Sequence, residues 1–514
     1  MASTLFNTFS AGNHASAIII PGKIPLTISF KDLTSEVLAF QMKLALLGIT
    51  PKAVVSLALP NSYEFIVAFL ATTCQRAISA PLNPAFKQDE YEFYLEDVKS
   101  AALLLPRGAY SQEGPAIRAA RKQKTVIAEC YWNGREVVLD IKEEGSLQGQ
   151  GNQKLERAQP YDIALVLHTS GTTGRPKAVP LSHRNIVRSI KNIQATYALD
   201  SQDRSLLVMP LFHVHGLLSG LLAPLYGGGS VIVPLKFSAS GFWSDFISHR
   251  ANWYTAVPTI HQILLKNPLP SPLPRIRFIR SCSSPLSPTT FHALEKAFKA
   301  PVLEAYAMTE ACHQISSNPL PPARRRPGSV GVGQGVAIQI LNQKGDEVPT
   351  GTEGEVCIKG GSLTAGYLNN PTANQESYTK LGYFRTGDQG KVDSEGYLYI
   401  TGRIKELINK GGEKISPIEL DNVLVQHPKV AQAVSFAIPD STYGQNVGVA
   451  ILPMENEKID QREIKDWVEE RLAAFKIPKE VFFTHQMPQT ATGKIQRRVV
   501  AQEMMKQQIF KAKL

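Results

Sequence analysis

A chain of 514 residues is too long for one compact hydrophobic core, so its length predicts two or more domains. A hydrophobic content of 43% and a mean hydropathy of -0.11 are typical of globular proteins and exclude the composition of disordered chains. The formal net charge of +11 fits anionic small molecules as ligands, with nucleic acid as the competing interpretation.

Basic residues are scattered along the chain, and the one tight cluster, Arg324, Arg325 and Arg326, lacks interleaved aromatic residues. Such a cluster is typical of a solvated loop, so we expect no nucleic acid partner. No apolar run reaches the roughly 18 residues that a membrane span needs, and the N-terminus does not resemble a secretory signal. The five cysteines form no CxxC pair, which predicts a reducing compartment rather than disulfides or a zinc site.

Short apolar runs alternate with segments of helical periodicity along the first 400 residues or so. One such segment carries Ile186, Ile190, Ile193 and Tyr197 on a single helical stripe. This alternation predicts βαβ units, hence an α/β fold with largely parallel sheets. Strands are expected at residues 53–59, 101–105, 163–167, 206–209, 230–234 and 276–279.

The pattern changes after about residue 400. Ser416 and Glu419 have capping-box spacing, with proline at the first helical position between them. A strand-like run follows at 431–438, and Asp460 precedes a second amphipathic helix. We therefore predict a large N-terminal domain over residues 1–402 and a small mobile α+β domain over residues 403–514.

Residues 168–177 (HTSGTTGRPK) carry the strongest local signal. They follow an apolar strand and precede an amphipathic helix that begins at about Ser182. Glycines that turn N–H groups inward, hydroxyl donors and the Lys177 cation predict a site for a polyphosphate. The Walker A spacing fails, and taken alone the segment is equally well explained as a polar surface turn.

Further motifs follow, and together with the loop they resemble the adenylate-forming superfamily, which includes acyl-CoA synthetases, luciferases and the adenylation domains of peptide synthetases. The resemblance covers essentially the whole chain. The motifs are YAMTE at 306–310, GYFRTGD at 382–388, GRIKELI at 402–408, GGEKI at 411–415 and PQTATGK at 488–494.

The resemblance implies that ATP activates a carboxylic acid as an acyl-adenylate, whose acyl group then passes to a thiol, with coenzyme A favoured. Because carboxylate and α-phosphate repel each other, catalysis needs positioning and neutralisation of charge. The resemblance also implies that the catalytic residues are Lys494, His213, Thr309 and Glu310. It further implies that Glu310 and Thr172 hold Mg²⁺. The implied ATP-binding residues are Thr169, Ser170, Gly171, Thr172, Thr173, Gly174, Lys177, Glu304, Ala305, Tyr306, Thr309, Asp388 and Arg403.

Lys494 is far in sequence from the phosphate loop, so a single site requires both domains. The family uses one site for two reactions by rotating its small domain, and Lys405 occupies the position of the hinge residue. After pyrophosphate leaves, rotation would withdraw Lys494 and bring Gly411 and Gly412 beside the pantetheine tunnel.

Four segments, 210–216, 253–262, 277–283 and 304–313, resemble the oxalate–CoA ligase branch, a relative of the 4-coumarate ligases. Aromatic ligases usually carry tyrosine where this chain has His215, small apolar residues in place of Cys282, Ser283 and Ser284, and proline in place of His313. A pocket with these polar residues suits a small, doubly charged acid better than an alkyl chain. The alternative is that these side chains only satisfy backbone groups.

Arg280 and Ser281 should face opposite ways on a strand, so only one of them is expected in the acyl pocket. We favour Ser281 together with Ser283, with His313 as the principal donor and His215 as a further member. The predicted substrate is oxalate or another short dicarboxylate, because a buried carboxylate needs donors or a cation.

Ala512, Lys513 and Leu514 resemble the S-K-L peroxisomal address, which predicts import through the peroxisomal receptor, with dual residence in the cytosol as an alternative. Other activities stay open at this point. The chain could be a 4-coumarate-like or medium-chain fatty acid CoA ligase, or an adenylation enzyme that loads a separate carrier protein. Nothing selects luciferase-type oxidation, and a nucleic-acid-binding protein would leave the motifs unexplained.

Overall fold

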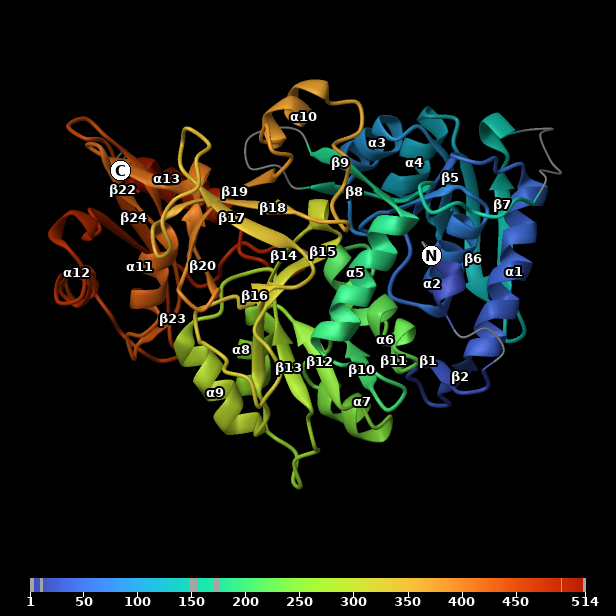
Figure 1. Cartoon of the computed structure of the whole chain (residues 1–514), viewed down its shortest axis with the longest axis horizontal. Coiled ribbons are helices and arrows are strands. Elements are labelled where there is room, and N and C mark those ends of the chain that lie inside the picture. Colours follow the sequence, from blue (N-terminus) through green and yellow to red (C-terminus); the bar gives the residue numbers. More distant parts are fainter. Residues whose placement is uncertain (1–3, 10–12, 148–154, 170–175, 491, 512–514) are drawn as a thin grey trace.

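Two large sheets form most of the chain, and a smaller C-terminal unit lies at the left in Figure 1. The computed structural model describes residues 4–9, 13–147, 155–169, 176–490 and 492–511. Helix α5 runs along the centre of the view, beside both large sheets (Figure 1). The predicted α/β class, with a large N-terminal part and a smaller C-terminal one, is confirmed.

The first large sheet has seven strands in the order β7-β6-β5-β3-β4-β8-β9. Its inner strands are parallel, and antiparallel β7 and β9 close its two edges. The strands are β3 (Val54–Leu57), β4 (Ile78–Pro81), β5 (Ser100–Leu105), β6 (Val126–Trp132), β7 (Val137–Glu143), β8 (Ile163–Thr169) and β9 (Lys177–Ser182).

The second large sheet has nine strands in the order β16-β15-β14-β13-β12-β10-β11-β1-β2. The strands from β14 to β1 run parallel, which matches the βαβ prediction. The strands are β1 (Ser16–Ile20), β2 (Leu26–Ser29), β10 (Arg204–Leu207), β11 (Ser230–Ile232), β12 (Trp253–Ala256), β13 (Phe278–Ser281), β14 (Val302–Met308), β15 (His313–Ser317) and β16 (Val332–Gly333).

Helices of the N-terminal part pack apolar stripes against these sheets, and one cluster of buried residues runs through both. Local sequence signals fix several helix starts: Ser182 Oγ accepts the Asn185 N–H at the start of α5, and proline opens α8 and α9. The helices are α1 (Phe30–Leu47), α2 (Tyr63–Cys74), α3 (Gln88–Asp97), α4 (Pro115–Lys122), α5 (His183–Thr196), α6 (Ala223–Tyr226), α7 (Phe242–Ser248), α8 (Pro258–Lys266), α9 (Pro288–Phe298), α10 (Pro371–Ser377) and the π-helix η4 (His215–Leu222).

A small antiparallel sheet leads from the large sheets to the C-terminal unit. It contains β17 (Ala337–Leu341), β18 (Gly354–Lys359), β19 (Phe384–Val392) and β20 (Leu398–Arg403). Directly after β20 come a short 3₁₀ turn, η6 (Ile404–Glu406), and the first strand of the last sheet.

The C-terminal unit has its own core, as its amphipathic pattern predicts. Helices α11 and α12 cover one cluster of buried residues, and α13 contributes Val500 and Met504 to another. Ser416 and Asp460 cap α11 and α12 by accepting the N–H groups of Glu419 and Glu463. The elements are β21 (Ile408–Lys410), β22 (Glu413–Ile415), α11 (Pro417–Leu424), β23 (Val430–Asp440), β24 (Gly444–Pro453), α12 (Gln461–Glu469), β25 (Glu480–Phe483) and α13 (Arg497–Lys511).

The helix expected from about Ser182 is confirmed as α5, which Ser182 caps, but the strand β9 between the loop and α5, paired with β8, was not predicted. The strands expected at 206–209 and 276–279 are shifted and span Arg204–Leu207 and Phe278–Ser281. Strand ends depend on pairing partners, which hydrophobic runs alone do not specify.

Candidate active site

Several predicted site residues lie where the parallel strands of the nine-stranded sheet end. His213 follows β10, Ser283 follows β13, and Glu310 follows β14. Because parallel strands present their carboxyl ends at one edge of a sheet, these segments meet there. Ligands of open α/β sheets bind at this edge.

Tyr306, Asp388 and Arg403 form one hydrogen-bonded group on this edge. The Tyr306 hydroxyl donates to Asp388 Oδ2, and Arg403 Nε lies 3.3 Å from Asp388 Oδ1. Asp388 and Arg403 also face each other across the ladder between β19 and β20. The predicted grouping of a ring, an acceptor and a cation from distant motifs is therefore present.

Two predicted nucleotide-site residues of β14 lie deeper in the sheet. Glu304 is buried and accepts the Gly328 N–H at 2.8 Å, and burial raises the pKa of Glu304 to about 8. Ala305 pairs with Ser317 of the neighbouring strand β15. The Glu304 carboxyl is therefore uncharged at neutral pH, and these two residues form part of the strand without adding a charge to the site.

Glu310 is a buried carboxylate beside a tyrosine and a lysine. Its Oε1 accepts the Tyr367 hydroxyl at 2.8 Å, and Lys177 Nζ lies 4.6 Å from the centre of the same tyrosine ring. Burial raises the pKa of Glu310, and the Lys177 charge opposes that shift. Thr309 precedes it in the short turn η5 (Thr309–Ala311).

Thr169 and Lys177 stand opposite each other at the ends of β8 and β9. They therefore flank the connection that contains the predicted phosphate loop. Its predicted ligands Ser170, Gly171, Thr172, Thr173 and Gly174 lie outside the described residues, as do Ala512, Lys513 and Leu514 of the predicted peroxisomal address. Their roles stay predictions.

The predicted acyl pocket contains two buried histidines. The rings of His215 and His313 stack with their centres 5.1 Å apart, and Ser283 Oγ lies 3.0 Å from His215 Nδ1. Neither ring nitrogen of His313 has a hydrogen-bond partner among the described residues. Burial, followed by the Arg280 charge, lowers the pKa of both histidines well below the usual value, so both rings are neutral at pH 7.

The preference for Ser281 over Arg280 in the acyl pocket stays a prediction, although Arg280 and not Ser281 contacts His215. The Arg280 guanidinium approaches His215 Nε2 to 3.5 Å, whereas the buried Ser281 Oγ has no hydrogen-bond partner among the described residues. Alternation correctly puts the two side chains on opposite faces of β13. Which face meets His215 depends on where η4 crosses the sheet, and this is a tertiary fact.

Lys494 reaches this edge from the C-terminal unit. The loop before it is held by Thr259 Oγ1, which donates to the Gly493 carbonyl oxygen at 2.9 Å. Desolvation, with the Arg403 charge as the next cause, lowers the pKa of Lys494 to about 8. Burial and the nearby Lys494 charge lower the pKa of His213 to about 4. Lys494 and His213 therefore share one site although they are far apart in sequence.

The predicted hinge and thiolation residues lie at the surface. Lys405 is exposed in η6, next to Glu406, whose Oε2 lies 3.2 Å from Arg497 Nε. Gly411 and Gly412 form the exposed turn between β21 and β22, and both have positive φ. The chain is thus in the orientation that presents Lys494, and not the glycine turn, to the site.

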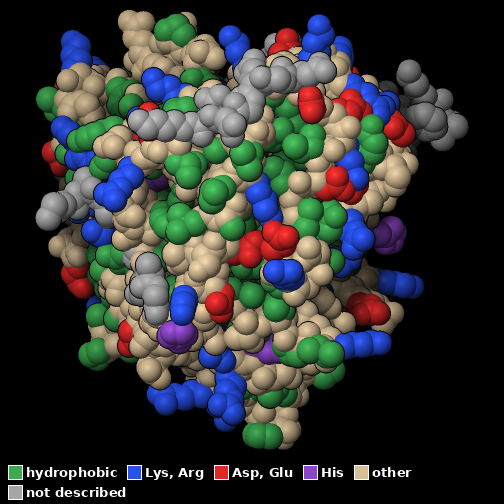
Figure 2. Space-filling view, turned by 90° about the vertical axis from the view of Figure 1, so that its right-hand side faces the viewer, with side chains coloured by type: hydrophobic (Ala, Val, Ile, Leu, Met, Phe, Trp, Pro, Cys, Tyr) green, Lys and Arg blue, Asp and Glu red, His purple; other side chains and the backbone are tan. Residues whose placement is uncertain are grey.

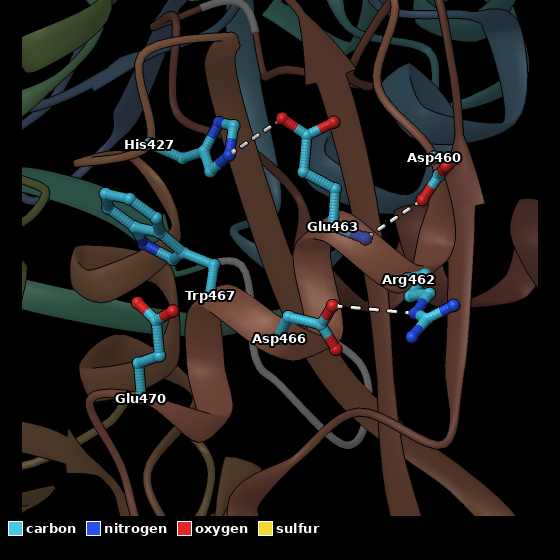
Figure 3. A pocket seen from close by; sticks show the side chains of 7 residues that line it. All are labelled: His427, Asp460, Arg462, Glu463, Asp466, Trp467 and Glu470. Carbon is cyan, nitrogen blue, oxygen red and sulfur yellow. Dashed lines mark hydrogen bonds and ion pairs between the residues drawn. The ribbon is translucent and has the colours of Figure 1, made fainter.

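The surface carries mixed charges, and it has a hollow on α12. On the face shown in Figure 2, basic side chains stand among acidic and hydrophobic ones, which matches the scattered charges of the sequence. A hollow of about 360 Å³ on α12 is lined by acidic residues around His427 and Trp467 (Figure 3). In it Glu463 lies 3.4 Å from His427, and Asp466 lies 3.7 Å from Arg462. Its acidic lining disfavours anions such as ATP and carboxylates.

Several residues of this edge escaped sequence reasoning. Thr255, Gln314 and Tyr197 contact Arg280, Thr259 holds the Lys494 loop, and Tyr367 binds Glu310. Thr255 and Thr259 lie within a segment that resembles the family, yet only their contacts distinguish them from ordinary strand and helix residues. No helix among the described residues is long and apolar enough to cross a bilayer.

Comparison with known families accounts for this arrangement. The model of the AMP-binding enzyme family matches residues 10–368, and that of the AMP-binding enzyme C-terminal domain matches residues 419–494. The chain belongs to the AMP-binding enzyme family. Among relatives within it, the chain is 47% identical to oxalate–CoA ligase of Saccharomyces cerevisiae, covering 99% of this chain and 98% of the yeast protein.

A second AMP-binding relative is oxalate–CoA ligase of Arabidopsis thaliana, 50% identical over 89% of this chain and 90% of the plant protein. The solved structure of ATP-bound MatB from Rhodopseudomonas palustris is similar, with a TM-score of 0.88 at 27% identity over 98% of this chain and 99% of MatB. The apo form of the same enzyme, with equal coverage and identity, has a TM-score of 0.78. The structure of this chain is thus more similar to that of the ATP-bound form than to that of the apo form.

Proposed function

We propose that this chain is an ATP-dependent acid–CoA ligase whose substrate is oxalate or another small dicarboxylate. In the first half-reaction a carboxylate oxygen attacks the α-phosphorus of ATP, forming the acyl-adenylate and releasing pyrophosphate. In the second, the coenzyme A sulfur attacks the acyl carbon, forming the thioester and releasing AMP. The observation that carries the proposal is the meeting of Lys494 and His213 beside the Tyr306–Asp388–Arg403 group.

The nucleotide-side contacts suit ATP. Asp388, already held by Tyr306 and Arg403, would accept the ribose hydroxyls, and the Tyr306 ring would pack beside the adenine. Lys177 and the loop that begins at Thr169 would neutralise the phosphates. The Lys494 ammonium would sit between carboxylate and α-phosphate, where negative charge gathers in the transition state.

Glu310 fits as a protein ligand of Mg²⁺. It is a buried carboxylate, and Mg²⁺ is usually held by one or two carboxylates together with substrate phosphates. Bound Mg²⁺ would lower the charge repulsion between the phosphates and the incoming carboxylate.

The acyl side supports a dicarboxylate. His313 is fully buried with two unpartnered ring nitrogens, which is unfavourable unless a ligand supplies a hydrogen bond. Ser283 is half-buried beside His215 and offers a hydroxyl. A second carboxylate one bond away from the reacting carboxyl would find these donors, whereas an alkyl chain would leave them unpaired.

The second half-reaction would require the domains to reorient. We infer a boundary between residues 402 and 403, with Lys405 as the pivot, since β20 ends there and the next sheet begins at Ile408. Rotation about this point would carry the Gly411–Gly412 turn toward the site as Lys494 leaves, opening the way for the pantetheine arm of coenzyme A.

His313→Ala tests the substrate assignment. Loss of one charge-assisted hydrogen bond should raise the KM for oxalate by about tenfold or more and leave the KM for ATP nearly unchanged. His292→Ala is the matched control, since His292 is exposed on α9. An equal rise in both KM values, or no change for oxalate, would contradict the assignment of His313 to the acid.

A further inference from the structure

A buried arginine lies behind the acyl pocket without a carboxylate partner. Arg280 is fully buried, and it forms no ion pair within the part of the chain that the structure describes; its donors reach only neutral groups. Its Nε donates to the Tyr197 hydroxyl at 2.7 Å, and its Nη2 donates to Gln314 Oε1 at 3.2 Å. Because burying an unpaired charge is costly, this cation calls for an explanation.

The remaining nitrogen of Arg280, Nη1, is linked to the acyl pocket through Thr255. The two residues are partners in the register of β12 and β13, so their side chains lie side by side. Arg280 Nη1 lies 3.1 Å from Thr255 Oγ1, and Thr255 Oγ1 lies 2.6 Å from His215 Nε2. On the other side of the ring, His215 Nδ1 faces Ser283 Oγ at 3.0 Å.

All hydrogen bonds in the series from Arg280 through Thr255 and His215 to Ser283 are donated in the same direction. Arginine can only donate, so Thr255 Oγ1 accepts from it and turns its own proton to His215 Nε2. Arg280 Nη1 also lies 3.5 Å from Nε2, which disfavours a second proton there. The neutral ring therefore carries its proton on Nδ1 and donates it to Ser283 Oγ. The Ser283 hydroxyl proton is then left to donate elsewhere.

We propose that Arg280 and Thr255 are positioning residues that fix the tautomer of His215, so that the Ser283 hydroxyl donates to the distal carboxylate of the acid. The inference rests on the proposed function and deepens it by naming what orients the recognising hydroxyl. We call the hydrogen-bonded series Arg280–Thr255–His215–Ser283 the relay. No proton is transferred during recognition, and the relay only selects one hydrogen-bonding pattern. The positive charge at its far end favours a dianionic acid over a monoanion.

Backbone geometry supports a recognition role for the two residues that face the acid. Ser283 has a φ of 73° and His313 a φ of 85°, a region that non-glycine residues rarely adopt. Ser283 follows the end of β13 and His313 opens β15, and His313 adds its unpartnered ring nitrogens to the Ser283 donor. The two residues with positive φ, Ser283 and His313, are thus the same residues that have hydrogen-bonding groups available for a ligand.

A double-mutant cycle tests the relay. Thr255→Val removes the hydroxyl with little change in shape and should raise the KM for oxalate by about tenfold, with the KM values for ATP and acetate little changed. In a Ser283→Ala background the same change should add almost nothing. Equal effects of Thr255→Val in both backgrounds, or an equal rise for oxalate and acetate, would overturn the relay.

Controls and a spectroscopic readout separate positioning from damage. Thr255→Ser should restore wild-type selectivity, and Thr72→Val removes a buried hydroxyl that bonds only the Ala68 carbonyl within α2. In ¹⁵N-histidine NMR of the whole chain, the His215 signals, identified with His215→Gln, should show an unprotonated Nε2. A protonated Nε2 would overturn the relay. If the wild-type enzyme rejects oxalate but shows this tautomer, the proposed substrate fails and the relay stands.

Discussion

Lys494→Ala is the most informative single change, because Lys494 is the one catalytic candidate that the C-terminal unit brings to the site. Its loop is held by the Thr259–Gly493 hydrogen bond, and its charge lowers the pKa of His213. We expect the variant to lose adenylation while it keeps most of its ability to transfer the acyl group from a supplied acyl-adenylate to coenzyme A.

The size of the loss follows from the environment of the lysine. Lys494 is half-buried, and desolvation lowers its pKa to about 8, so its ammonium interacts with anions more strongly than it would in bulk water. Removing one preorganised donor from such a site typically lowers kcat by about 10²–10³-fold, or about 2.7–4 kcal/mol. The ammonium is the active form, so adenylation by the wild-type enzyme should also fall as pH rises through about 8, more steeply than thioester formation from a supplied adenylate.

Pyrophosphate release measures the first half-reaction, and thioester formation from a supplied acyl-adenylate measures the second. Lys465→Ala is a matched control, because Lys465 is a half-buried lysine of the same unit whose Nζ donates to the Lys479 carbonyl. If Lys494→Ala slows both half-reactions equally, the assignment of Lys494 to adenylation alone is wrong.

Three further changes separate the two half-reactions and the two substrates. Lys405→Pro fixes one φ angle at the inferred pivot, so pyrophosphate exchange should survive while thioester formation falls; equal rates for proline and alanine variants would remove Lys405 as pivot. A methyl group at Gly493 would lie 2.9 Å from Thr259 Oγ1 at a φ of 79°, so Gly493→Ala should slow adenylation but spare transfer from a supplied adenylate, and a uniform loss would speak against this docking. Asp388→Asn should raise the KM for ATP by about tenfold with little effect on that for oxalate, and the reverse pattern would contradict its place on the nucleotide side.

Sequence reasoning reached the fold class because its signals are local. Alternation of apolar runs with helical stripes predicts parallel sheets, and capping residues such as Ser416 and Asp460 mark helix starts that the structure confirms. Strand β9 was missed, since it follows a loop rich in glycine and threonine and gains its stability from pairing with β8. Its extent is therefore set by a partner rather than by its own composition.

The site was predictable as far as ordered motifs specify it, and not beyond. The motifs named Tyr306, Asp388 and Arg403 before their contacts were known. The sequence did not reveal that Arg280 contacts His215, because the two faces of β13 are equivalent in sequence until η4 and β15 are packed on them. The sequence likewise did not mark Thr255 as a functional residue, since its role lies in hydrogen bonds to Arg280 on the neighbouring strand and to His215 of η4.

The central claim is that this AMP-binding enzyme activates a small dicarboxylate and transfers it to coenzyme A. Its most direct test is pyrophosphate release across a panel of carboxylates, with and without coenzyme A, using oxalate, acetate, coumarate and a medium-chain fatty acid. We predict the highest kcat/KM for oxalate and thioester formation only when coenzyme A is present. A preference for coumarate or the fatty acid would contradict the claim.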